Sequence, residues 1–201
     1  MRIGECLEFG WETFKRHAGA FVLVTFCLLL ANALLNAVLG WLLKGFGGML
    51  SLLVSGLFSG GLMAAARKGA RGESPTLNDA FWPFTTRQGD FLIVGLATNI
   101  GILACGIGVI ATAFLFLFSS LLVVEGADYK TALVRSKDLM LANPGEAIVF
   151  CLVLAAVNLA GAIALGVGLL VSIPVSSLAI VKAYELASQP AVLPPAVQGT
   201  V

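Results

Sequence analysis

The sequence has little charge and few of the side chains that enzymes commonly use. Charged residues make up 11% of its 201 residues and hydrophobic residues 59%, against about 25% and about 45–50% in soluble globular domains. A surface this apolar is unfavourable in water and favourable in lipid. The net charge of +1 provides no strongly basic face for nucleic acid. The composition therefore predicts an integral membrane protein with no nucleic-acid partner.

Groups for catalysis or metal binding are equally scarce. His17 is the only histidine, and the usual nucleophile, zinc and phosphate-binding motifs do not occur. No pair of cysteines forms a C-x-x-C motif, and three of the four lie inside apolar runs, so neither a disulfide framework nor a zinc site is expected. The four are Cys6, Cys27, Cys105 and Cys151. The sequence predicts a protein that is not an enzyme and holds no metal or cofactor.

What the chain does have is long apolar stretches separated by charged islands. The islands are residues 1–17, 67–90, 125–146 and 182–185, and the stretches are 18–66, 91–124 and 147–181. Even the shortest stretch holds 34 residues, and a single helix of that length would extend about 51 Å at about 1.5 Å per residue. The hydrocarbon core of a bilayer is only about 30 Å thick. Each stretch is therefore expected to form a hairpin of two helices.

Glycines near the middle of each stretch suit a tight turn between two helices. Gly48, Gly108 and Gly168 are spaced by sixty residues, which is typical of three copies of one structural unit, and we expect them at the outer turns. The sequence thus predicts an all-α transmembrane bundle of about six helices in three hairpins, each preceded by an amphipathic interfacial helix. Residues 1–188 form a single domain, and 189–201 form a Pro-rich, disordered cytoplasmic tail.

The basic residues predict the orientation in the membrane. Eleven of the twelve Lys and Arg residues lie in the charged islands, and Lys44 is the exception. Basic residues concentrate on the cytoplasmic side of membrane proteins, so the islands and both termini are expected in the cytoplasm. The middle stretch offers only about 15 or 16 residues per helix, over 91–105 and 109–124, below the roughly 17–25 of a full span. It either crosses a thinned bilayer or re-enters it, which leaves between four and six spans.

Local signals mark where several helices start and which faces they bury. Thr76-x-x-Asp79 predicts a capping box, and Asn143 followed by Pro144 predicts the start of the last hairpin. A helix within 1–17 is expected to bury the face formed by Ile3, Leu7, Gly10 and Phe14. A second helix, after Asp128, is expected to bury the face formed by Tyr129, Ala132, Leu133, Ser136 and Met140. Such segments lie in the plane of the membrane surface.

Two sets of residues are candidates for function. Four asparagines, Asn32, Asn36, Asn99 and Asn158, fall within the apolar stretches. They either form an intramembrane polar cluster that binds a headgroup or lines a passage, or they only join helices by hydrogen bonds, which the sequence favours. Ionisable side chains at bilayer depth, which mark ion-coupled transport, are missing.

The second set is Arg67, Lys68 and Arg71, which follow directly on an apolar helix. Each basic residue near an anionic leaflet contributes about 1 kcal/mol, so these three are predicted to contact anionic lipid. The alternative is that they only determine topology during insertion.

Several short motifs resemble those of uncharacterised bacterial multi-pass membrane proteins, related to the membrane domain of some glycerophosphodiester phosphodiesterases. They are Gly72-Glu73-x-Pro75, Asp79-x-Phe81, Glu125 with Ala132-Leu133-x-x-Ser136 and Asn143, and Gly166-x-Gly168 to Pro174 with Tyr184. The resemblance implies a membrane bundle in the bacterial inner membrane with cytoplasmic amphipathic segments. The phosphodiesterase's catalytic carboxylates and histidines have no counterpart here, so it implies no catalytic residue.

These observations predict a non-enzymatic membrane protein that contacts lipid or organises the membrane, with membrane lipids as its partners. Two alternatives remain: a passive transporter or channel built around the Asn-bearing helices, and a membrane anchor for a partner protein. The sequence specifies neither a substrate nor an oligomeric state.

Overall fold

The computed structural model describes residues 2–43, 47–99, 107–164 and 167–188, and every regular element in these ranges is a helix. The ten helices are α1 (Ile3–Arg16), α2 (Ala18–Leu43), α3 (Gly47–Ala70), α4 (Leu77–Thr85), α5 (Gln88–Asn99), α6 (Ile107–Leu115), α7 (Ser119–Val124), α8 (Tyr129–Ala142), α9 (Pro144–Ile163) and α10 (Leu169–Ser188). The predicted all-α class is therefore confirmed. Lys44, Cys105 and the tail 189–201 lie outside the described residues.

Three of the described helices are long and apolar enough to cross a membrane. They are Ala18–Leu42 within α2, Pro144–Ile163 and Leu169–Ser188. In the middle stretch, the described parts of the helices comprise 12 residues in α5 and nine in α6, and residues 100–106 between them lie outside the described residues.

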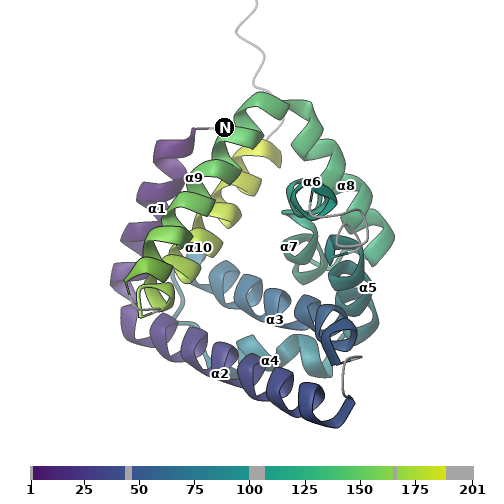
Figure 1. Cartoon of the computed structure of the whole chain (residues 1–201). Coiled ribbons are helices and arrows are strands. Elements are labelled where there is room, and N and C mark those ends of the chain that lie inside the picture. The colour runs from purple at the N-terminus through teal and green to yellow at the C-terminus, as the bar shows by residue number, and fades with distance from the viewer. Residues whose placement is uncertain (1, 44–46, 100–106, 165–166, 189–201) are drawn as a thin grey trace, which may run out of the picture.

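The helices form two groups on either side of α3 (Figure 1). On one side α1 and α9 flank α10, and on the other side lie α5, α6, α7 and α8. Helix α3 contacts both groups through α10, α5 and α7, and it also packs on α2 and α4. The main hydrophobic core contains side chains from α3 and from both groups of helices. Its fully buried members include Phe91, Phe118, Phe150 and Leu178.

The amphipathic face predicted near the N-terminus is confirmed in α1. Gly10 and Phe14 are buried, and Ile3 and Leu7 are partly buried against the core. This face packs on α10, so closely that a Cβ on Gly10 would lie 2.7 Å from the carbonyl oxygen of Val175. The absence of a side chain at Gly10 therefore permits the contact between the two helices.

A still closer approach joins α3 to α5. A Cβ on Gly56 would lie 1.9 Å from the carbonyl oxygen of Phe91, and one on Gly60 would lie 2.5 Å from the Phe91 ring. Small residues four apart let two helix backbones approach closely in membrane bundles. The Gly56-x-x-x-Gly60 sequence is thus a packing surface for α5.

The three glycines spaced by sixty residues lie at corresponding places along the chain. Gly48 and Gly108 are each the second residue of a helix, in α3 and α6, and Gly168 immediately precedes α10. Each is therefore at the start of the later helix of its apolar stretch. Residues 44–46, 100–106 and 165–166, which precede the three glycines, lie outside the described residues, so the outer turns themselves stay a prediction.

The expectation of one continuous helix over 109–124 is wrong, because α6 and α7 are separated at Phe116–Phe118. Ser136 of α8 is buried beside the break. Its hydroxyl accepts a hydrogen bond from the Phe118 amide at 3.1 Å and donates one to the Leu115 carbonyl at 2.9 Å. A hydroxyl from another helix thus supplies partners for backbone groups at the break, which is how interruptions are tolerated in apolar surroundings.

Two predicted helix starts are confirmed. Thr76 and Asp79 form the reciprocal capping box that opens α4, and α9 begins with Asn143 as N-cap and Pro144 at its first position. The Asn143 side chain makes no capping hydrogen bond, so the start of α9 depends on Pro144 and not on the amide. In α8 the predicted buried face is confirmed through Ala132, Ser136 and Met140.

Candidate functional site

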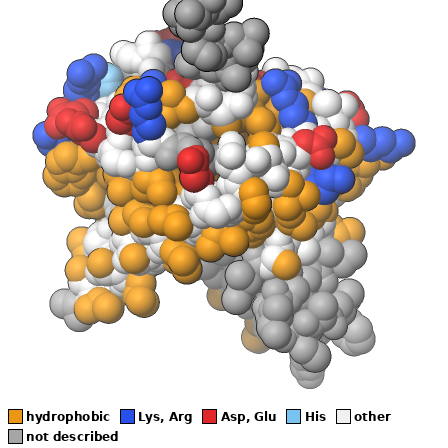
Figure 2. Space-filling view, turned by 90° about the horizontal axis from the view of Figure 1, so that it is seen from above, with side chains coloured by type: hydrophobic (Ala, Val, Ile, Leu, Met, Phe, Trp, Pro, Cys, Tyr) orange, Lys and Arg blue, Asp and Glu red, His pale blue; other side chains and the backbone are white. Residues whose placement is uncertain are grey.

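Charged and apolar side chains separate on the surface of the molecule. Figure 2 shows acidic and basic side chains gathered along the upper part of one view, with hydrophobic side chains in a zone beneath them. The exposed apolar residues include Leu34 and Trp41 of α2 and Leu152, Leu159 and Ile163 of α9. This is the surface expected of a bundle with one side in water and a belt in lipid.

A cleft of about 320 Å³ opens beside the end of α3. Its lining includes three basic and three acidic side chains, Arg67, Lys68, Arg71, Glu73, Asp79 and Glu125. The lining also has an apolar part, Ala64, Trp82 and Val124. We call this cleft the α3-end pocket. It brings together all three of the basic residues that the sequence predicted to contact lipid.

Arg67 is the most heavily paired residue of the α3-end pocket. Its guanidinium lies 2.7 Å from a Glu125 carboxylate oxygen and 2.5 Å from one of Glu185, and its side chain is 20% exposed. Glu125 caps the end of α7, and Glu185 lies in the last turns of α10. Arg67 therefore joins three helices, and its charge is already compensated within the protein.

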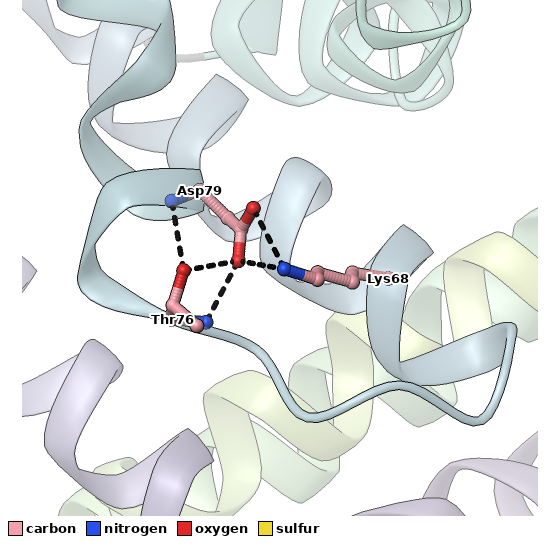
Figure 3. Close-up of polar contacts among 3 residues, drawn as sticks. All are labelled: Lys68, Thr76 and Asp79. Atoms are coloured by element: carbon pink, nitrogen blue, oxygen red, sulfur yellow. Dashed lines mark hydrogen bonds and ion pairs between the residues drawn. The ribbon is translucent and has the colours of Figure 1, made fainter.

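Lys68 is also engaged, with Asp79 of α4 (Figure 3). Its ammonium donates to both Asp79 carboxylate oxygens, at 2.9 and 3.2 Å. The same carboxylate accepts hydrogen bonds from the Thr76 amide at 2.8 Å and the Thr76 hydroxyl at 2.6 Å. Burial alone raises the pKa of Asp79, but the bonds from Thr76 and Lys68 outweigh it and lower this pKa below the usual 3.8.

The lowered pKa of Asp79 predicts a loss of stability in acid. A carboxyl whose pKa is lower in the folded state contributes stability that is complete above the unfolded pKa of 3.8 and is lost as the pH falls through the folded value. We expect Asp79→Asn to remove this contribution, so that the free energy of unfolding falls less steeply as the pH is lowered. Unfolding in detergent between pH 6 and pH 3 measures the slope of the free energy of unfolding against pH. Asp138→Asn, at a side chain that is 65% exposed, is the control and should keep the wild-type slope; equal slopes for both variants would contradict the prediction.

Arg71 and Glu73 differ from the other charged residues of the pocket. Neither has a hydrogen-bond or ion-pair partner for its side chain within the part of the chain that the structure describes, and both are exposed. Between them Gly72 has a φ of +82°, and its amide donates to the Gly69 carbonyl at 2.9 Å. A left-handed glycine of this kind ends a helix. The turn thus places at the pocket one cation and one anion that have no partner among the described residues.

The four candidate asparagines belong to three separate hydrogen-bond groups. Asn36 donates to the Asn32 side chain at 2.8 Å on the surface of α2. Asn99 of α5 donates to Ser55 of α3 at 2.8 Å. The third group joins α9 to α10, where Asn158 donates to Ser176 at 2.8 Å and accepts from Ser172 at 3.2 Å. Asn99 and Asn158 therefore join neighbouring helices by hydrogen bonds, which is the interpretation that the sequence favoured.

Sequence reasoning missed three residues of the site. Trp82 was not among the candidate residues, and Glu125 and Glu185 were not connected with Arg67. A signal existed, because Glu125 and Glu185 share the sixty-residue spacing of the glycines. That spacing places both at equivalent helix ends, where one cation can reach them.

Comparison with protein-family models, with curated proteins and with solved structures finds no match for the chain.

Proposed function

We propose that the chain is a non-enzymatic integral membrane protein that contacts phospholipid, and that the α3-end pocket binds a phospholipid headgroup. One observation carries the proposal: the lining of the pocket combines cations with the apolar residues Ala64, Trp82 and Val124. A phospholipid has the same division, because its charged headgroup phosphate is joined to an apolar diacylglycerol. We also propose that the chain is related to the membrane domain of some glycerophosphodiester phosphodiesterases.

The membrane arrangement that we propose has three hairpins. They are α2 with α3, α5 with α6 and α7, and α9 with α10, while α1, α4 and α8 lie at the interface. The three helices of spanning length support it, and so does the gathering of charge on one side. The charged side then faces the cytoplasm of a bacterial inner membrane.

This arrangement predicts that both ends of the chain are cytoplasmic and that Lys44 lies outside. We expect reporter fusions at the two ends to give the cytoplasmic signal, because 11 of 12 basic residues lie on that side. A fusion near Lys44 should give the opposite signal. A cytoplasmic signal near Lys44, or an external signal at either end, would contradict the topology.

The proposal of a headgroup pocket predicts that Arg71→Gln weakens phospholipid binding. Arg71 is the pocket cation without a partner among the described residues, and a basic residue near anionic headgroups contributes about 1 kcal/mol, which is about fivefold in affinity. Titration of the purified chain with diacyl phospholipid, followed by native mass spectrometry, measures it. Arg16→Gln is the matched control, since Arg16 is exposed in α1 and is not part of the pocket lining. Equal binding by both variants would refute the pocket as the lipid site.

The channel alternative has less support from the site. A polar passage needs side chains that offer hydrogen bonds to a solute, whereas Asn99 and Asn158 donate to Ser55 and Ser176 of adjacent helices. Interhelical bonds of this type contribute on the order of 0.6–2 kcal/mol to helix association. We therefore place lipid contact ahead of passive transport.

A further inference from the structure

We propose that the α3-end pocket selects a zwitterionic headgroup, a phosphodiester carrying a primary ammonium, over an anionic one. This inference rests on the proposed function and names its ligand class. Two properties of the pocket carry it: the balance of its charges, and the identity of the two side chains left without a partner.

The balance of charges is against a net anion. The lining contributes three cations and three carboxylates, and Glu185 outside the lining takes a further bond from Arg67. Two of the three cations, Arg67 and Lys68, are committed to ion pairs at 2.5–2.9 Å. Because Asp79 and Glu125 are compensated in those same pairs, the lining charges without a partner among the described residues are Arg71 and Glu73. A headgroup with a net negative charge would be repelled by Glu73, since like charges at close range are unfavourable. A headgroup with no net charge avoids this repulsion.

The free groups match the two ends of such a headgroup. Arg71 presents a guanidinium, whose planar fork suits phosphate oxygens. Lys68 adds a third ammonium N–H, because Asp79 takes two. The carboxylate of Glu73 is acceptor-only and suits an ammonium donor. Arg71 and Glu73 are two residues apart across Gly72, so one short phosphate–ammonium unit can contact both.

Trp82 supports the assignment of a cation to the same pocket. Trp82 is one of the residues that line the cleft, and its ring makes an edge-on contact with Phe91, at 6.1 Å between centroids and 83° between planes. An indole face attracts cations more strongly than other aromatic rings do. The pocket therefore has two groups that favour an ammonium, one charged and one aromatic.

Competition between two lipids with the same acyl chains tests the inference. The purified chain is offered equal amounts of phosphatidylethanolamine and phosphatidylglycerol, and bound lipid is counted by native mass spectrometry. We expect the wild type to favour phosphatidylethanolamine by up to about fivefold, because an exposed ion pair such as that of Glu73 with the ammonium contributes up to about 1 kcal/mol. Glu73→Gln should abolish this preference through weaker phosphatidylethanolamine binding, and Arg71→Gln should weaken both lipids. Glu8→Gln, at an exposed acid of α1 outside the pocket, is the control and should keep the wild-type ratio.

The outcomes separate this inference from the proposed function. A preference for phosphatidylglycerol, or an unchanged ratio in Glu73→Gln, overturns the zwitterionic assignment while the lipid site stands. Binding of both lipids that is unaffected by Arg71→Gln overturns the site itself. Soluble glycerophosphoethanolamine is included as a competitor, and we expect it to bind far more weakly than the lipid. Equal affinity for this soluble headgroup would show a free phosphodiester, and not a membrane lipid, to be the ligand.

Discussion

Gly56→Ala is expected to destabilise the bundle by about 3 kcal/mol, at the upper end of what overpacking usually costs. The reason is geometric, because the new Cβ would lie 1.9 Å from the Phe91 carbonyl oxygen and 2.8 Å from Gly95. Both neighbours are backbone atoms, so no rotamer change relieves the contact and α5 must move away from α3. Denaturant unfolding in mixed micelles measures the loss.

The matched control for this prediction is Gly40→Ala. Gly40 is also inside a helix, α2, and a Cβ there meets nothing within 4 Å. Alanine is a better helix former than glycine by up to about 1 kcal/mol, so this variant should be as stable as the wild type or more so. If Gly56→Ala were equally harmless, the close packing of α3 on α5 would be refuted.

Arg67→Gln is expected to give the second largest loss, about 2 kcal/mol. Removing one partner of a buried pair leaves the remaining charge uncompensated and typically costs about 3–5 kcal/mol. We expect less here because the Arg67 side chain is 20% exposed and Glu185 is 34% exposed, so solvent screens part of the effect. The same unfolding assay applies.

Two further variants separate the charge effect from general damage. Replacing Arg67, Glu125 and Glu185 together by Gln removes the unpaired carboxylates and should recover part of the stability. Lys15→Gln removes the Lys15–Glu12 pair, in which both side chains are about half exposed, and should change stability by less than about 0.5 kcal/mol. A triple variant no more stable than Arg67→Gln would contradict the proposed role of the carboxylates.

Local features of the fold were predictable from the sequence because their causes are local. The capping box of Thr76 and Asp79 and the start of α9 at Pro144 depend on residues at most three positions apart. The buried face of α1 follows from helical periodicity. The separation of charged islands from apolar stretches is read directly from the sequence.

The remaining features depend on contacts between distant parts of the chain. The break between α6 and α7 is stabilised by Ser136 of α8, whose partners Leu115 and Phe118 lie in the preceding apolar stretch. The candidate site depends on a pair between Arg67 and Glu185, which are 118 positions apart. The sequence indicated that Arg67, Lys68 and Arg71 act as a group, because they are close together in the chain. It did not indicate their acidic partners, because the ion pairs depend on the packing of α3 against α4, α7 and α10.

The packing of α1 on α10 has a consequence for how the chain is made. Gly10 fits against Val175 and Ala179, and the Lys182 ammonium lies 5.2 Å from the centre of the Phe9 ring. Helix α1 thus docks on a helix that is synthesised about 165 residues later, as the positions of Gly10 and Val175 show. At about 5–20 residues per second that interval lasts roughly ten to thirty seconds. Throughout this interval, the apolar face of α1 is without its partner helix, and the contact between α1 and α10 forms only after α10 has been made.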